Sequence, residues 1–173
     1  MMWSQLKKRT EENFAISLQG RLEIFNTRYR KSHDQEGEGW ITFDEKKIYN
    51  FASISYLIEF EKKAYEIRQS TGNIDFRNPN HKEGYYAAYD KANFDTKEQG
   101  VFALWDFNKA LFELQNTSID KAIKSENPII RAFAVVDKRF GKRKILDYDI
   151  SNEHELVKLM LSIRKEVEGI SNK

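Results

Sequence analysis

The stretch that decides the fold reads NPIIRAFAVVDKRFGKRK, from Asn127 to Lys144. Asn127 is a favoured helix cap, and Pro128 suits the first helical position, where its missing N–H costs nothing. The apolar positions behind this start are Ile129, Ile130, Phe133, Val136 and Phe140. Their helical spacing predicts a buried helix, and Gly141 is typical of the left-handed residue that ends one.

A basic segment, Asp137 to Lys144, follows this apolar run and holds five lysines and arginines. Donors from Arg139, Lys142 and Arg143 at a helix end are able to converge on a phosphate or carboxylate. A structural interpretation stands beside this one. Cations near a helix C-terminus stabilise the helix dipole, and Asp137 is able to pair with Arg139 or with Arg143. On the binding hypothesis, replacing both arginines by alanine leaves stability nearly unchanged.

Composition places the chain among ordinary globular proteins. It has 173 residues, 29 lysines and arginines against 27 acidic residues, and no cysteine. This length predicts one domain, residues 1–173, with a core of its own. The net charge of +2 means that a basic site has to be local. Without cysteine, disulfides, thiol nucleophiles and thiolate metal sites are excluded.

The N-terminus and the hydropathy pattern predict a cytoplasmic protein with no membrane segment. The basic stretch Lys7 to Arg9 is not followed by the apolar region of a secretory signal. No window approaches the roughly 18 apolar residues that a membrane-spanning helix needs.

The first third of the chain predicts a helix and a small antiparallel sheet. Trp3, Leu6 and Phe14 indicate a helix of about four turns that ends at Gly20. Residues rich in β-branched and aromatic side chains then predict strands at 21–30, 39–43 and 48–51, with a polar loop at 33–38.

The remainder is helical in pattern. Helices are expected at 53–69, 82–93, 97–115, 118–125 and 127–140, with a short extended segment at 145–146 and a last helix after Ser151. Thr96 to Gln99 has the pattern of a capping box, which predicts that the helix 97–115 starts there. The fold class is therefore α+β: a helix, a three-stranded antiparallel sheet and about five helices.

Two resemblances bear on these segments. MWSQLK (2–7), LQGR (18–21), NPIIRA (127–132) and DKRFGKR (137–143) are similar to a family of small, uncharacterised bacterial proteins. That resemblance implies a bacterial, cytosolic protein and no particular activity. Residues 118–141 also resemble one helical hairpin of the HEAT type. Since HEAT arrays need several stacked copies, a single copy indicates a local helix pair and no solenoid.

A second basic cluster surrounds Tyr29, between Arg28 and Arg30. Such a cluster is able to hold phosphates while the ring stacks on a base, which makes nucleic acid or another anionic partner a hypothesis. Alternation along a strand sends Arg28 and Arg30 to one side and Tyr29 to the other, so Tyr29 is expected to pack inward.

The catalytic and metal-site interpretations have little support. Asp44 with Glu61 and the lysines after it has the residue types of a nuclease motif. That motif needs its glutamate and lysine on a strand, but Glu61 falls within a helical pattern. An enzyme would have to gather its groups from separate elements, with Asp44, Glu59, Glu61 and Asp137 as the candidates. The three histidines, His33, His81 and His154, lack the spacing of metal ligands, so no metal or cofactor is expected.

The aromatic residues suggest a further alternative. Tyr85, Tyr86 and Tyr89 are followed by the aromatic-rich helix predicted at 97–115, whose apolar residues do not all share one face. This helix is therefore either central or an interface for a partner or a second copy. The leading hypothesis is a non-enzymatic binding protein that contacts anions through Arg139, Lys142 and Arg143. The alternatives are a protein-interaction module or homo-oligomer and, third, an enzyme.

Overall fold

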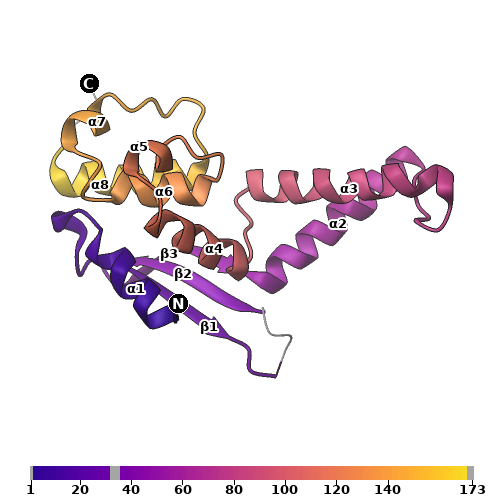
Figure 1. Ribbon diagram of the computed structural model, residues 1–173, viewed down its shortest axis with the longest axis horizontal. Coiled ribbons are helices and arrows are strands. Elements are labelled where there is room, and N and C mark those ends of the chain that lie inside the picture. Colours follow the sequence, from indigo (N-terminus) through magenta and orange to yellow (C-terminus); the bar gives the residue numbers. More distant parts are fainter. Residues whose placement is uncertain (1, 32–35, 171–173) are drawn as a thin grey trace.

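The computed structural model describes residues 2–31 and 36–170, and half of the predicted loop 33–38, with His33, lies outside these ranges. Figure 1 shows the arrangement of the elements. In chain order they are α1 (Trp3–Glu12), the 3-10 turn η1 (Ile16–Leu18), β1 (Leu22–Arg28), β2 (Gly37–Phe43), β3 (Lys46–Ala52), α2 (Ser53–Thr71), α3 (Pro79–Glu98), α4 (Leu104–Gln115), α5 (Ile119–Ala122), α6 (Pro128–Val136), α7 (Lys142–Leu146) and α8 (Glu155–Glu168). The predicted α+β class is confirmed.

The sheet is an antiparallel meander with the strand order β1-β2-β3. Ile24 pairs with Ile41, and both side chains are fully buried on the inner face. Phe25 pairs with Trp40 on the outer face. A tight turn joins β2 to β3 through Asp44 and Glu45, which have φ angles of 47° and 66°. This left-handed pair matches the twist of a two-residue hairpin.

The core lies where α6 meets α4 and α8 above the sheet (Figure 1). Seven of the nine residues of α6 are buried, as its apolar sequence predicts. Asn127 caps the helix, since its Oδ1 accepts a hydrogen bond from the N–H of Ile129 at 2.9 Å. On the sheet, α4 packs against Gly39, where an added Cβ would lie 2.7 Å from Phe107 Cδ1. The glycine therefore allows the close approach of helix and strand.

The predicted first helix is too long. α1 ends at Glu12, and Phe14 forms an isolated antiparallel bridge with Asp137. The N–H of Ala15 donates to the carbonyl of Val136 at 2.8 Å, and the N–H of Lys138 donates to that of Asn13 at 2.8 Å. This pairing, between segments far apart in sequence, pulls Phe14 into the core, where it is 1% exposed.

The same bridge corrects the end of the central helix. α6 stops at Val136 because Asp137, in the extended conformation, pairs with Phe14 and cannot continue the helix. Gly141 has φ −68° and caps the start of α7, so the predicted left-handed C-cap is wrong. The expected extended segment at 145–146 is likewise helical, as part of α7.

The predicted helix 97–115 ends where expected, at Gln115, but its predicted start is wrong. Thr96 is fully buried within α3, which runs on to Glu98. The chain then turns at Gly100, with φ 80°, and α4 begins at Leu104. In a capping box, the side chain at the third helical position accepts a hydrogen bond from the N–H of the cap residue. Here the carboxylate of Asp106 accepts from the N–H of Ala103 at 3.2 Å, and this contact was predicted seven residues earlier, at Gln99.

Two further predictions differ less from the structure. The last helix, α8, begins after His154 and not at Ser151. α5 has only four residues, so the segment that resembles a HEAT hairpin holds one turn and one helix. α2 and α3 lie side by side and project away from the rest of the fold as a two-helix arm (Figure 1).

Candidate binding surfaces

The arm, α2 with α3, has an aromatic interior of its own. The rings of Tyr56 and Phe60 stack with centroids 5.7 Å apart, and Phe60 meets Tyr89 at 5.3 Å. Tyr89 in turn lies 5.5 Å from Tyr85. Buried small residues, Ala64, Ala88 and Ala92, bring the two helix backbones together. Tyr85 and Tyr89 therefore pack within the arm.

One cation belongs to this interior. The guanidinium of Arg68 lies over the rings of Tyr85 and Tyr89, 4.7 Å and 4.8 Å from their centroids. Its side chain is 11% exposed, and its nearest carboxylate, that of Glu61, is 4.0 Å away. Arg68 therefore binds the two helices to each other through cation–π contacts.

The outside of the arm carries exposed apolar side chains. Among the described residues, most of the large apolar side chains that are exposed lie between 53 and 98: Ile54, Ile58, Tyr65, Ile74, Phe76, Tyr86 and Phe94. On α2, Ile54, Ile58 and Tyr65 are four and seven residues apart, which places them on one helix face. This face is apolar and solvent-exposed, a combination typical of an interaction surface.

The basic segment is mostly neutralised from within. Asp137 is 2% exposed, and Arg139 Nη2 lies 2.7 Å from its Oδ2. Lys138 Nζ donates to the carbonyl of Glu12 at 2.8 Å, and Lys144 pairs with Asp120 at 2.6 Å. The structural interpretation of Asp137 with Arg139 is thus what the structure shows.

Two cations of the segment remain available. Lys142 Nζ lies 3.9 Å from Glu168 Oε2, which is too long for a hydrogen bond. Arg143 is exposed and makes no hydrogen bond or ion pair with the described residues. Lys142 stands at the mouth of a hollow between η1 and α8.

Arg28 and Arg30 lie elsewhere. Arg28 ends β1 and lines a hollow of about 530 Å³ with Trp3 and Phe112, while Arg30 is exposed beyond the strand. In Figure 1 this end of β1 is at the far side of the molecule from α7. Tyr29 is 40% exposed and not packed inward, because β1 has ended at Arg28. The structure does not bring the predicted basic clusters together.

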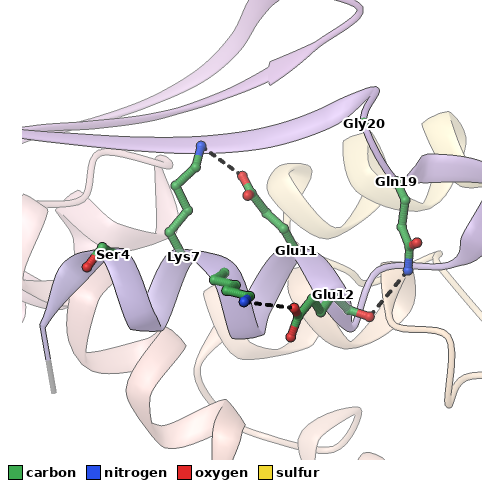
Figure 2. Close-up of a pocket in the computed structure, with 7 residues that line it drawn as sticks. Ser4, Lys7, Glu11, Glu12, Gln19 and Gly20 are labelled. Atoms are coloured by element: carbon green, nitrogen blue, oxygen red, sulfur yellow. Dashed lines mark hydrogen bonds and ion pairs between the residues drawn. The ribbon is translucent and has the colours of Figure 1, made fainter.

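A hollow beside α1 is lined in part by Lys7 and Glu11, and these two side chains have a structural role (Figure 2). β1 is an edge strand, and its Ile24 turns both backbone groups toward α1. Lys7 Nζ donates to the carbonyl of Ile24 at 2.7 Å, while Glu11 Oε1 accepts from its N–H at 2.9 Å. Lys7 and Glu11 also pair at 3.0 Å. Together they occupy an edge that would otherwise be free to pair with another strand.

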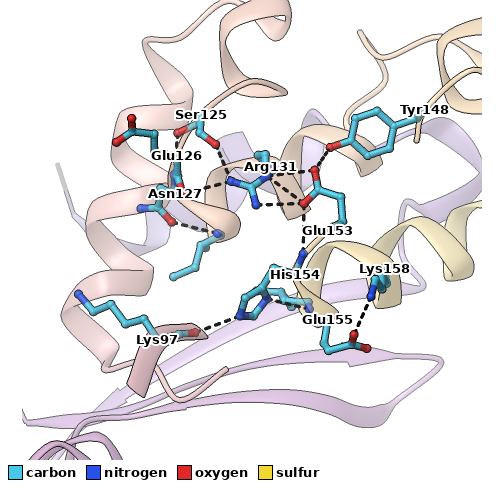
Figure 3. A network of polar contacts seen from close by, with 12 residues as sticks. Lys97, Ser125, Glu126, Asn127, Arg131, Tyr148, Glu153, His154, Glu155 and Lys158 are labelled. Carbon is cyan, nitrogen blue, oxygen red and sulfur yellow. Dashed lines mark hydrogen bonds and ion pairs between the residues drawn. The ribbon is translucent and has the colours of Figure 1, made fainter. Parts of the chain in front are cut away.

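A polar network joins α6 to the segment before α8 (Figure 3). Arg131 meets Glu153 with Nη2 3.0 Å from Oε2, and its Nη1 donates to the carbonyl of Ser125 at 2.6 Å. Tyr148 donates its hydroxyl to Glu153 Oε1. Burial acts to raise the pKa of Glu153, but the hydrogen bonds from Tyr148 and Arg131 outweigh it and hold this pKa below the ordinary value. Sequence reasoning missed Glu153 and Tyr148, because no local pattern links them to Arg131.

His154 belongs to the same network and caps α8. Its Nδ1 accepts the N–H of Leu156 at 3.0 Å, and its Nε2 lies 3.0 Å from the carbonyl of Lys97 (Figure 3). An Nδ1 that accepts leaves the proton on Nε2, so the ring donates to Lys97. His154 is therefore the N-cap of α8, and its contact with Lys97 joins the base of the arm to α8.

The carboxylates proposed for an enzyme do not lie together in one site. Asp44 lies in the β2–β3 turn, where Arg21 holds its pKa below the ordinary value by hydrogen bonding. Glu59 and Glu61 lie on the arm, and Asp137 is buried beneath Arg139. In the described ranges, no group of three or more histidine and acidic side chains is placed to hold a metal ion.

None of the helices in residues 2–31 and 36–170 combines the length and the apolar character of a membrane span. Searches of curated proteins and of solved structures find no match. A family model, however, matches residues 2–165, nearly the whole chain. The chain therefore belongs to the SF0329 protein family.

Proposed function

We propose that this protein works by binding another protein and not by catalysis, and that the arm is its contact surface. The observation that carries the proposal is the exposed apolar face of α2, with Ile58 62% and Tyr65 58% exposed. Exposed apolar patches on a defined element are typical of protein–protein contact sites.

The shape of the arm supports the proposal. α2 and α3 pack chiefly on each other and reach away from the core (Figure 1). Their own stability comes from the aromatic interior and from the seam of Ala64, Ala88 and Ala92. Ile54, Ile58 and Tyr65 are exposed on α2 and so are available to a partner. Phe76 and Tyr86, although exposed, also contact the ring of Tyr85.

This proposal modifies the hypotheses drawn from sequence. The predicted interface at 97–115 moves to the arm, because α4 is central and buries Leu104, Phe107 and Leu111. The leading hypothesis, an anion-contacting surface, retains Lys142 and Arg143, since Arg139 is engaged with Asp137. A bacterial, cytoplasmic setting stays a prediction.

The test uses a photoreactive benzoylphenylalanine at Tyr65 or Tyr86, in the cells that make the protein. Irradiation is expected to attach one defined partner at both arm positions. The same residue at Lys121, exposed and off the arm, is expected to attach none. The partner is identified by mass spectrometry, and attachment of a second copy of the chain would make the arm a homo-oligomer interface.

A matched pair of variants decides whether the contact is apolar. Ile58→Glu places a charge on the exposed face of α2 and is expected to abolish attachment at Tyr65. Leu146→Glu changes a similarly exposed apolar residue on α7 and is expected to leave the attachment intact. Equal attachment from Lys121, or attachment that survives Ile58→Glu, would refute the arm as the contact surface.

A further inference from the structure

A hollow of about 530 Å³ lies between the start of α1, the end of β1 and α4. α1 contacts both β1 and α4 at this place, on the side of the core away from α8 (Figure 1). Its volume is in the range of small-molecule binding sites. The side chains that set its chemistry are Trp3, Leu6, Asn26, Arg28, Asn108 and Phe112. None of them belongs to the arm, so what the hollow binds is independent of the proposed protein contact.

Two glycines on β2 leave the polar side chains of β1 uncovered. Asn26 pairs with Gly39, and Arg28 pairs with Gly37. Because glycine has no side chain, no group on β2 lies directly across from the amide of Asn26 or the guanidinium of Arg28. Both side chains therefore face the space between α1 and α4.

The charge of Arg28 is unopposed. Within residues 2–31 and 36–170, its guanidinium has no hydrogen-bond or ion-pair partner. The described lining of the hollow includes no carboxylate, and the first turn of α1 has no acidic residue. A guanidinium binds a carboxylate or a phosphate through two parallel hydrogen bonds. An anion in this hollow thus meets one cation and no opposing charge from the described lining.

A pair of amides supplies a second donor. Asn26 Nδ2 donates to Asn108 Oδ1 at 2.8 Å, where α4 packs on β1. This bond uses the acceptor of Asn108 and leaves its N–H groups, which make no other hydrogen bond with the described residues. The hollow therefore offers a charged fork and a neutral donor.

The remaining walls are aromatic and apolar. The ring of Trp3 is held from behind by Phe107, with centroids 6.0 Å apart. Phe112 stands at the rim with 50% of its surface exposed, and Leu6 is buried at the base. Aromatic side chains pack well against another flat ring. These walls fit a ligand with an aromatic body.

We propose that this hollow binds a small aromatic oxyanion, its charged end on Arg28 and Asn108 and its ring against Trp3 and Phe112. Aryl carboxylates and aryl phosphates share this chemistry. The closing experiment therefore compares one of each.

The test is a titration of the full chain with phenylacetate and with phenyl phosphate, followed by NMR. The chain has three tryptophans, Trp3, Trp40 and Trp105, and each gives one indole N–H signal. A saturable shift is expected for Trp3. Trp40, on the outer face of the sheet, and Trp105, against Tyr56 of the arm, are internal controls and are expected to stay unchanged. Whichever of the two anions binds more tightly identifies the head group.

A neutral ligand and a matched pair of variants isolate the charge. Phenylacetamide has the shape of phenylacetate without its charge and is expected to bind more weakly. Arg28→Gln is expected to weaken phenylacetate about tenfold or more, the value of a charge-assisted hydrogen bond, and to leave phenylacetamide unchanged. Arg30→Gln removes the neighbouring exposed cation and is expected to change neither affinity.

A second pair of variants tests the aromatic wall. Phe112→Ala is expected to weaken phenylacetate and phenylacetamide alike. Phe94→Ala removes an exposed ring on the arm and is expected to weaken neither. Thermal melting of each variant checks that the fold persists.

Three results would overturn this site. The first is the absence of a saturable Trp3 shift with both anions. The second is equal affinity for phenylacetate and phenylacetamide, which would mean that the charge of Arg28 plays no part. The third is an equal loss of affinity in Arg28→Gln and Arg30→Gln, which would mean general attraction to a basic surface. None of them bears on photo-crosslinking from the arm, so the two proposals fail separately.

Discussion

The guanidinium of Arg139 lies against the buried carboxylate of Asp137, with Nε 3.0 Å from Oδ1 and Nη2 2.7 Å from Oδ2. Asp137 Oδ1 also accepts the backbone N–H of Arg139 at 2.8 Å. This pair forms the corner at which α6 ends and the chain crosses beside Phe14. The arginine that looked most suited to bind an anion therefore already holds one, and it is part of the fold.

Arg139→Ala is expected to lower the free energy of unfolding by about 1–3 kcal/mol, because the buried Asp137 loses its charged partner. Arg143→Ala is expected to change it by less than about 0.5 kcal/mol, since that side chain is exposed and unpaired among the described residues. Urea denaturation of both variants makes the comparison. Equal stability of the two would mean that the pair contributes nothing, as the sequence-based binding hypothesis expected.

Glu153→Gln tests the network in Figure 3. The pKa of Glu153 is lower in the fold than its ordinary value, so the group stabilises the protein above about pH 4.3 and this contribution is lost as the pH falls through the folded pKa. We expect the variant to be less stable than wild type at pH 7 and to lose less stability between about pH 5 and pH 3. Thermal melting across this range measures both.

The control for that experiment is Glu113→Gln, on an exposed position of α4. It is expected to keep both the wild-type stability and the wild-type slope with pH. If Glu153→Gln retains the full acid dependence, other carboxylates are responsible for it.

Ala88→Leu is expected to loosen the arm without unfolding the core. Ala88 is 2% exposed at the seam of α2 and α3, where a larger side chain costs about 1–3 kcal/mol by overpacking. Ala87→Leu, the exposed neighbour, is the matched control. Hydrogen exchange is expected to speed up in α2 and α3 for Ala88→Leu alone, with α6 and α8 unchanged. Faster exchange in α6 as well would show that the arm and the core unfold together.

Gly39→Ala is expected to destabilise the protein by about 1–3 kcal/mol, since its Cβ would lie 2.7 Å from Phe107 Cδ1 and 3.1 Å from Leu104 Cδ1. Gly141→Ala is expected to change stability by no more than about 0.5 kcal/mol. Its φ of −68° suits alanine, and no atom lies within 4 Å of the added Cβ. Chemical denaturation distinguishes them. A large loss in Gly141→Ala would restore the left-handed turn predicted from sequence.

Features that depend on neighbouring residues were predictable. Asn127 and Pro128 begin α6 as expected, because a cap is a contact over two residues. The three strands were found near their true positions, because their composition and turns are local signals. Of the polar network in Figure 3, sequence reasoning found neither Glu153 nor Tyr148, because no local pattern links them to Arg131.

By itself, then, the sequence determined the α+β class, the order of the elements and the start of the central helix, since these follow from short-range sterics, capping and periodicity. Only the tertiary structure decided where α1 and α6 end, because the bridge between Phe14 and Asp137 joins residues 123 positions apart. It also decided which cations are available. The buried carboxylates of Asp137, Glu153 and Glu168 each pair with an arginine that the fold brings close. Such pairing depends on distance in the folded chain and not on distance along the sequence.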